Sequence, residues 1–231
     1  MNNLMTIRFR VLSVALVLLG LLGCASTPGG GIISEPSGQG PFPAVIVFHT
    51  SGGLRDHEKI YARNLSRQGY VALTVDYFGG TGTNTTDGYE YLIALPNVDP
   101  DKIGLVGFSR GGRAALWFAS RLSLMDSEHQ ISGVVNYYIG NAIVPWVKGT
   151  KHPPILFLHG EEDETVQPIE ITNYCEIQRE NGTICDYHIY KGIGHAFTHQ
   201  TKYNTYDSST TKDAWKRALA FLDKHVKRES Q

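Results

Sequence analysis

The sequence predicts an α/β fold, with a mainly parallel sheet of about six strands and helices on both of its faces. Short apolar runs alternate with longer, helix-like stretches from residue 43 onward, as in strands joined by crossover helices. The apolar runs are hydrophobic at nearly every position, which is typical of strands covered on both sides. The chain has 231 residues, of which 42% are hydrophobic. Residues 43–231 can therefore form one sizeable domain, and the length leaves no room for two large ones.

The expected elements follow one another in regular order. Strands are expected at residues 44–49, 70–76, 102–106, 131–138, 154–159 and 185–190. Helices are expected at residues 56–68, 89–95, 112–124, 168–180 and 211–227, with a loop of Gly, Thr and Asn at 79–88. Pro168 suits a first helical turn and Gly182 a helix end. Trp215, Leu219 and Leu222 recur at a spacing that gives the last helix one buried face.

Residues 1–23 are expected to be an export signal. Arg8 and Arg10 precede an apolar run at residues 11–22, which is shorter than the roughly 20 residues of a membrane-spanning helix. The run ends in Leu21-Leu22-Gly23-Cys24, which resembles a bacterial lipobox, where the chain is cut before a cysteine that receives acyl chains. The alternatives are a plain signal peptide with an incidental cysteine and an uncleaved anchor.

We therefore expect Cys24 to carry lipid and residues 24–42, rich in Gly, Ser and Pro, to form a flexible tether before the domain. Several acyl chains would hold the protein firmly at a membrane surface. Because Ala25 rather than Asp follows the cysteine, the resemblance implies the outer membrane if the cell is Gram-negative.

The composition limits the class of partner. The formal net charge is −1 and no block of Lys and Arg stands out, so a nucleic-acid-binding surface is not expected. We expect a small-molecule substrate and no cofactor, and we favour a monomer.

The stretch Gly107-Phe108-Ser109-Arg110-Gly111 lies between an expected buried strand and an expected helix. A nucleophilic serine at such a turn needs small residues two positions before and after it, because the strained turn leaves no room for side chains. Gly107 and Gly111 occupy those positions. A glycine-rich turn that only permits tight packing is the alternative, but the strand and helix context favours Ser109 as a nucleophile.

A serine hydroxyl needs a base to take its proton and an acid to orient that base. The strand at 154–159 leads into Glu161-Glu162-Asp163-Glu164, and the strand at 185–190 leads into a loop that holds His195. Loops after parallel strands emerge at one edge of the sheet. We predict Asp163 as the acid and His195 as the base, although Glu161, Glu162 and Glu164 are close alternatives to Asp163.

Two backbone amides are expected to bind the oxyanion. One belongs to Arg110, directly after the nucleophile, and the other to the loop His49-Thr50-Ser51-Gly52-Gly53, where we assign it to Ser51. The glycines of this loop are equally consistent with a simple flexible turn. His199 follows His195 by four residues, but no second cluster of His, Cys and carboxylates accompanies it in the sequence, so no metal is assigned.

Two cysteines remain besides Cys24. Cys175 lies before the end of the helix at 168–180 and Cys185 begins the next strand, so helix rise and strand rise nearly match and the two residues can face one another. Export would allow a disulfide. We predict a Cys175–Cys185 bond, with two buried free thiols as the alternative.

Five stretches, in this order and spacing, make the chain similar to the dienelactone hydrolase family of α/β-hydrolases. They are V-I-V-F-H-T-S-G-G-L, R-Q-G-Y-V-A-L-T-V-D-Y, V-D-P-D-K-I-G-L-V-G-F-S-R-G-G, L-F-L-H-G-E-E-D and Y-K-G-I-G-H-A-F. The resemblance covers most of residues 43–227. It implies the α/β-hydrolase fold in a single domain without a large lid. It also implies a triad of Ser109, Asp163 and His195, in the chain order that this fold uses.

Several positions depart from the family pattern. The family has cysteine where this chain has Ser109, and glutamate where it has Thr50; an arginine that binds the substrate carboxylate would fall near His199, and the region between Asp76 and Leu95 is shortened. A carboxylesterase acting on small esters or lactones therefore fits better than dienelactone hydrolysis itself. A thioesterase or peptidase with the same triad, or an inactive surface-binding lipoprotein, are the alternatives.

Overall fold

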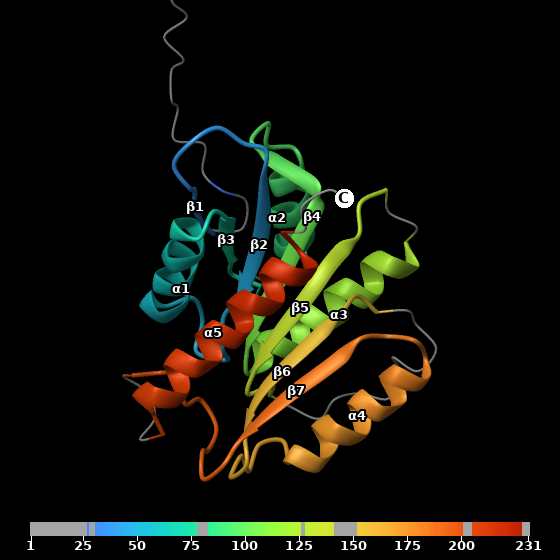
Figure 1. Ribbon diagram of the computed structural model, residues 1–231. Helices are drawn as coiled ribbons and strands as arrows, with labels where there is room; N and C mark the ends of the chain where they lie inside the picture. The colour runs from blue at the N-terminus through green and yellow to red at the C-terminus, as the bar shows by residue number, and fades with distance from the viewer. Residues whose placement is uncertain are drawn as a thin grey trace, which may run out of the picture.

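The computed structural model describes residue 27 and residues 31–77, 83–125, 128–140, 152–200 and 205–227. Its strands are β1 (Ile32–Ser34), β2 (Phe42–Phe48), β3 (Val71–Val75), β4 (Val98–Phe108), β5 (Ile131–Tyr137), β6 (Ile155–Gly160) and β7 (Cys185–Tyr190). Its helices are α1 (Asp56–Arg67), α2 (Thr83–Ile93), α3 (Arg110–Leu124), α4 (Pro168–Glu180) and α5 (Ser208–His225). The strands form one sheet in the order β1-β3-β2-β4-β5-β6-β7 (Figure 1).

Every pair of neighbouring strands except β1 with β3 is parallel. The α/β fold with a mainly parallel sheet is thus confirmed. The parallel strands all end at one edge of the sheet, so the loops after β2, β4, β6 and β7 leave the sheet on the same side. The sequence places its candidate site residues in these four loops.

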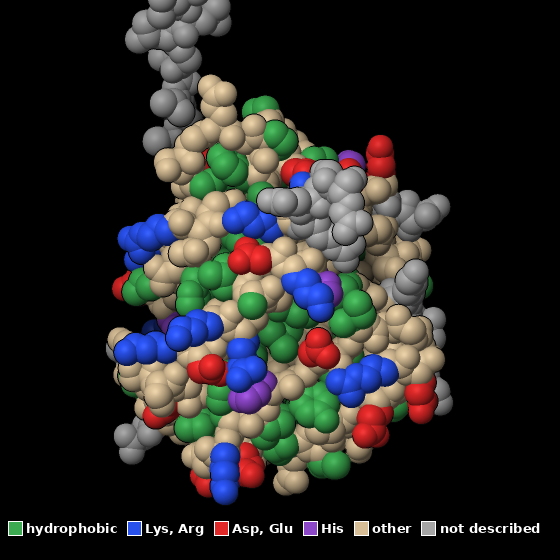
Figure 2. Space-filling view, in the orientation of Figure 1, with side chains coloured by type: hydrophobic (Ala, Val, Ile, Leu, Met, Phe, Trp, Pro, Cys, Tyr) green, Lys and Arg blue, Asp and Glu red, His purple; other side chains and the backbone are tan. Residues whose placement is uncertain are grey.

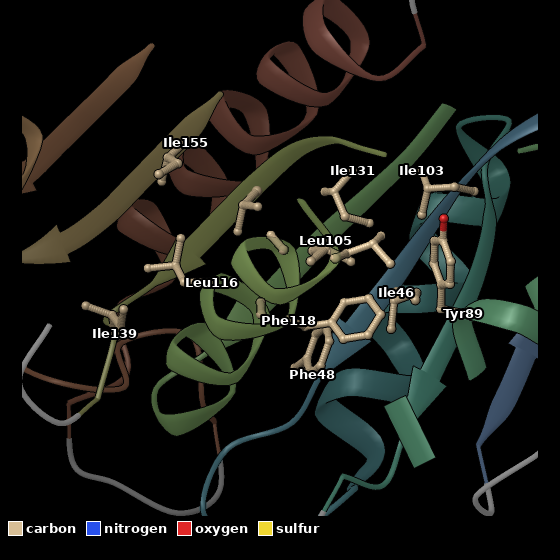
Figure 3. Close-up of a cluster of buried hydrophobic side chains, with 14 of the residues drawn as sticks. Ile46, Phe48, Tyr89, Ile103, Leu105, Leu116, Phe118, Ile131, Ile139 and Ile155 are labelled. Carbon is tan, nitrogen blue, oxygen red and sulfur yellow. The ribbon is translucent and has the colours of Figure 1, made fainter. Parts of the chain in front are cut away.

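The helices cover both faces of the sheet, as predicted (Figure 1). Successive β2 side chains point to opposite faces, so Ile46 and Phe48 pack in one core and Val45 and Val47 in the other. The first core takes its helical side chains from α2, α3 and α4, and Figure 3 shows part of it, with labelled residues of α2 and α3 beside β2, β4 and β5. The second core takes them from α1 and α5.

A seventh strand, β1, lies within the stretch expected to be tether. It pairs antiparallel with β3, with Ile32 opposite Thr74. The Thr74 hydroxyl accepts a hydrogen bond from the Ile32 amide at 3.0 Å and donates one to the Ile32 carbonyl at 3.2 Å. Three residues are too few for a periodic pattern, and the pairing partner lies 42 residues away. The strand was therefore missed from the sequence.

The prediction of a loop at 79–88 is wrong from Thr83 onward, because α2 begins there. The Thr- and Asn-rich start of this helix has low intrinsic helix propensity, but its later residues Tyr89 and Leu92 are buried against the sheet. Tertiary packing therefore makes the helix begin before the expected residue 89, although it ends at Ile93.

The structure joins Cys175 of α4 to Cys185 of β7 by a disulfide, with the two Cα atoms 5.2 Å apart. This is the pairing that the sequence spacing predicted. Both residues are buried, and the bond fastens α4 to the edge strand of the sheet.

Among the described residues, no helix is both long and apolar enough to span a membrane. The expected signal peptide at 1–23 and its Cys24 lie outside the described residues.

Candidate active site

Ser109 lies at a sharp turn between β4 and α3. Its backbone has φ 53° and ψ −121°, a strained conformation for a residue with a side chain. The turn is fixed by a hydrogen bond from the Ser109 amide to the Tyr137 carbonyl at 3.0 Å and by one from the Gly112 amide to the Ser109 carbonyl at 2.9 Å. The strain is therefore imposed by the neighbouring strand and the start of the helix.

The two glycines around Ser109 are required by close backbone contacts. A Cβ atom on Gly107 would lie 2.5 Å from the Gly111 carbonyl oxygen and from Gly112. A Cβ atom on Gly111 would lie 2.6 Å from the Phe48 carbonyl oxygen and still closer to that of His49. The glycine spacing in the sequence thus reflects the packing of the turn against the end of β2.

The turn presents the Ser109 hydroxyl to His195. Ser109 Oγ lies 2.9 Å from His195 Nε2, and His195 Nδ1 lies 2.7 Å from Asp163 Oδ2. With the proton of the neutral imidazole on Nδ1, Ser109 donates to His195 and His195 donates to Asp163. The structure therefore brings together the three residues singled out in the sequence, from the loops after β4, β6 and β7, in an arrangement that can move a proton off Ser109.

Asp163 differs from its acidic neighbours in burial. Its side chain is fully buried, whereas Glu161, Glu162 and Glu164 are exposed. Oδ1 accepts hydrogen bonds from the Thr165 amide at 2.8 Å and the Val166 amide at 3.2 Å. Burial alone would raise the pKa of Asp163, but the hydrogen bond and charge interaction with His195, with a smaller contribution from the Val166 amide, outweigh it and lower the pKa below its ordinary value. Asp163 is therefore a carboxylate at neutral pH.

A second histidine, His159, also contacts Asp163. It lies at the end of β6, is fully buried, and holds Nε2 3.3 Å from Asp163 Oδ2 and 2.8 Å from the Val166 carbonyl oxygen. Burial lowers the pKa of His159, so its imidazole is neutral and donates from Nε2. His159 was not singled out from the sequence, although its position four residues before Asp163 could have indicated a contact with that carboxylate.

The loop after β2 holds the expected oxyanion amide. Three of its amides are used within the loop and α1: Thr50 donates to Glu58 Oε1 at 3.4 Å, and Gly52 and Gly53 donate to the Thr50 hydroxyl and carbonyl, both at 3.2 Å. No described residue accepts a hydrogen bond from the Ser51 amide. Ser51 is exposed in the turn that follows β2, so its amide is available to a ligand.

The second expected amide, that of Arg110, lies at the first residue of α3. Gly140 flanks it after β5, because a Cβ atom on Gly140 would lie 2.8 Å from the Arg110 amide nitrogen and 2.7 Å from Ser109 Oγ. A side chain at position 140 would thus crowd the nucleophile. The close approach of this glycine was not recognised from the sequence.

Glu58 is a second functional candidate that sequence reasoning missed. Its fully buried carboxylate accepts the Thr50 amide at one end of the loop and the Arg55 amide, at 3.1 Å, at the other. Burial raises the pKa of Glu58, but hydrogen bonding and the charge interaction with His57 prevail and lower it. An ionised side chain of α1 therefore holds both ends of the loop that contains Ser51.

His199 has companions that the sequence did not reveal. The fold brings it to His57, whose ring stacks on the His199 ring with centroids 4.7 Å apart, and to Glu58. The expectation that no His and carboxylate cluster accompanies His199 is therefore wrong. His57 and Glu58 lie some 140 residues earlier in the chain, so no local spacing could reveal the cluster.

Comparisons with known proteins agree with this architecture. The model of the dienelactone hydrolase family matches residues 30–91 and 81–226. A protein of Aquifex aeolicus (strain VF5) named "Putative carboxymethylenebutenolidase" is 26% identical over 224 residues, covering 85% of this chain and 94% of the relative.

Two solved structures resemble the fold. A dienelactone hydrolase-like promiscuous phosphotriesterase from metagenomic libraries has a TM-score of 0.74 at 22% identity, covering 84% of this chain and 92% of its own. Apo esterase 2 of Thermogutta terrifontis has a TM-score of 0.68 at 19% identity, covering 84% and 88%. The family match over most of the chain, together with this fold, shows that the protein belongs to the dienelactone hydrolase family of α/β-hydrolases and is a hydrolase acting on ester bonds.

Proposed function

We propose that the protein is a serine hydrolase that cleaves small carboxylic esters or lactones through an acyl-enzyme. The observation that carries this proposal is the hydrogen-bonded chain from Ser109 through His195 to the buried, ionised Asp163. A serine with this base and acid serves acyl transfer on many folds. Ser109 stands where the family resemblance calls for cysteine, which favours ordinary ester hydrolysis over dienelactone.

In the proposed reaction, His195 takes the Ser109 proton as Oγ attacks the ester carbonyl. Asp163 holds the Nδ1–H tautomer and stabilises the imidazolium that forms. The Ser51 and Arg110 amides bind the oxyanion of the tetrahedral intermediate. His195 then gives its proton to the leaving alcohol. A water molecule, activated by the same imidazole, hydrolyses the acyl-enzyme and regenerates Ser109.

Hydrolysis of p-nitrophenyl acetate by the full-length chain tests this proposal. The Ser109→Ala variant should lose at least about 1,000-fold in kcat/KM, because the attacking oxygen is gone. A fluorophosphonate probe should label the wild-type protein and spare the variant. Ser132→Ala is the matched control, because the Ser132 hydroxyl donates to the Asp101 carbonyl at the far end of the sheet. Full esterase activity in Ser109→Ala would sink the proposal, and absence of both hydrolysis and labelling in the wild type would favour an inactive binding protein.

We further propose that the protein is exported and anchored by lipid on Cys24 at a bacterial membrane. The order of basic residues, apolar run and Leu21-Leu22-Gly23-Cys24 supports this proposal. Cells grown with labelled palmitate should incorporate label into the wild-type chain and not into a Cys24→Ser variant. Membrane fractionation should show the same difference. Equal labelling of both chains would contradict lipidation at Cys24.

A further inference from the structure

We propose that His57, Glu58 and His199 form a binding site for a transition-metal dication such as Zn²⁺, separate from the Ser109 triad. The three side chains each offer one ligand atom, and these atoms all lie within 4.8 Å of one another. His57 and Glu58 belong to the first turn of α1, and His199 belongs to the loop after β7.

The donor set is one that zinc uses. Two imidazoles and one carboxylate bind Zn²⁺ at roughly 2.0–2.2 Å, and a fourth, open position is filled by water or another ligand. Donor atoms around one such ion are about 3.4 Å apart, so the present spacing of up to 4.8 Å must close by up to about 1.4 Å. Closing this gap requires the partly exposed His57 ring to turn out of its stack on the His199 ring.

The charge of the cluster also favours a cation. The Glu58 carboxylate is fully buried. Buried charges are stable only when they are paired or bind metal. The partners of Glu58 are two backbone amides and the His57 ring, whose Nδ1 is 3.4 Å from Oε1. A dication would compensate this anion more strongly than two amides and an imidazole ring do.

His57 is oriented as a metal ligand would be. Its Nδ1 is buried and lies 3.4 Å from Glu58 Oε1, while its Nε2 lies 3.0 Å from Thr198 Oγ1. Thr198 in turn lies 2.5 Å from the Tyr138 hydroxyl. Metal-binding histidines usually bind the ion through one nitrogen and an outer partner through the other. Thr198 is that outer partner here, which leaves Nδ1 to face Glu58 and the ion.

The cluster is reached through a cavity of about 930 Å³ between α1, α5 and the loop after β7. His57 and His199 line it, together with aromatic residues that include Tyr61 and Trp215. Figure 2 shows this face, with hydrophobic side chains exposed between Lys and Arg side chains. The open position of the ion would face this cavity.

The site is distinct from the nucleophile. It shares no residue with the Ser109 triad, and the His57 ring packs edge-on against Phe108, the residue before Ser109, with centroids 4.6 Å apart. Metal binding therefore does not depend on whether the protein is an esterase. Loss of hydrolysis with retained metal binding would count against the proposed function alone.

Spectroscopic titration with Co²⁺ tests the proposal on the full-length, untagged chain after dialysis against a chelator. One equivalent of CoCl₂ should bind per chain and give visible absorption bands of a low-symmetry site, which ZnCl₂ should abolish by displacement. His57→Gln and His199→Gln should each weaken binding by at least about 100-fold, since loss of an outer-shell partner already costs 10- to 100-fold. His188→Gln is the matched control, because His188 lies on β7 and contacts Tyr190 instead of this cluster.

Thermal unfolding gives a second, independent measurement of metal binding. ZnCl₂ should raise the Tm of the wild type and of His188→Gln, and should leave the Tm of the two ligand variants unchanged. If one of the two ligand variants does not fold, metal binding by the other variant still tests the proposal. Failure of the wild-type chain to bind Co²⁺, or wild-type affinity in both ligand variants, would overturn the proposal.

Discussion

Asp163 differs from the neighbouring acidic residues in its burial and its hydrogen-bond partners. Four acidic residues follow β6, and only one of them has a buried carboxylate with two backbone amides on one oxygen and two histidines on the other. His159 limits the freedom of that carboxylate, because its Nε2 lies 3.3 Å from the oxygen that receives His195. The second histidine thus fixes the direction in which Asp163 faces the base.

At this scale we predict that Asp163→Asn lowers kcat on p-nitrophenyl acetate by about 10⁴-fold. The amide side chain favours the imidazole tautomer with its proton on Nε2, which cannot accept the Ser109 proton. The rate at which coloured p-nitrophenol is released at saturating substrate measures kcat. Glu162→Gln is the control, since Glu162 is an exposed neighbour on the same loop, and it should keep the wild-type rate. Equal rates in Asp163→Asn and the wild type would show that another acid orients His195.

The strand-turn-helix unit from β4 to α3 decides how Ser109 is presented. Its turn packs directly on the backbone of β2, whose Phe48 pairs with Gly107 in the sheet. The Cys175–Cys185 disulfide ties α4 to β7, the edge strand that leads to His195. A cross-link over so short a loop contributes about 2–3 kcal/mol in the chain-entropy model.

For this unit we predict that Gly111→Ala both destabilises the fold and removes activity. The new Cβ would meet the Phe48 carbonyl oxygen at 2.6 Å, so the turn or β2 must shift, at a cost of about 1–3 kcal/mol. Urea unfolding and esterase rate are the measurements. Gly133→Ala is the matched control, because its Cβ would meet only side-chain atoms, the nearest at 3.3 Å. Comparable stability and activity in the two variants would contradict the prediction.

For the whole molecule, buried titratable groups link stability to pH. Glu58 and Asp163 are buried as anions with lowered pKa values, and His159 is buried as a neutral ring with a lowered pKa. In each case the unfolded chain binds a proton more readily than the folded one. Acid therefore favours the unfolded state through all three groups.

We predict that the free energy of unfolding falls as the pH drops below 6.5, the ordinary value for His159. It should fall further below about 4.5 and 3.8, where Glu58 and then Asp163 begin to take up protons in the unfolded chain and later in the folded one. Urea unfolding at a series of pH values measures this. His159→Gln should flatten the curve between pH 6.5 and 5 and leave the steeper acid limb. Stability that is constant or rising from pH 7 to pH 4 would contradict the assignment.

The sequence by itself determined the parallel α/β sheet, the turn around Ser109, the Asp163 and His195 loops and the Cys175–Cys185 pairing. Each of these depends on patterns within a short stretch: apolar runs, glycine spacing, and the polar loop after a strand. Strands and helices that alternate along the chain indicate a parallel sheet, and the carboxyl ends of parallel strands meet at one edge for geometric reasons.

Only the tertiary structure decided which acid is buried, that His159 supports it, and that Glu58 holds both ends of the Ser51 loop. It also decided the edge strand β1 and the meeting of His57 and Glu58 with His199. These features depend on contacts between distant segments, such as the hydrogen bond between His57 and Thr198, which are 141 residues apart. Burial and charge compensation at such contacts are properties of the packed chain, so no local pattern of residues encodes them.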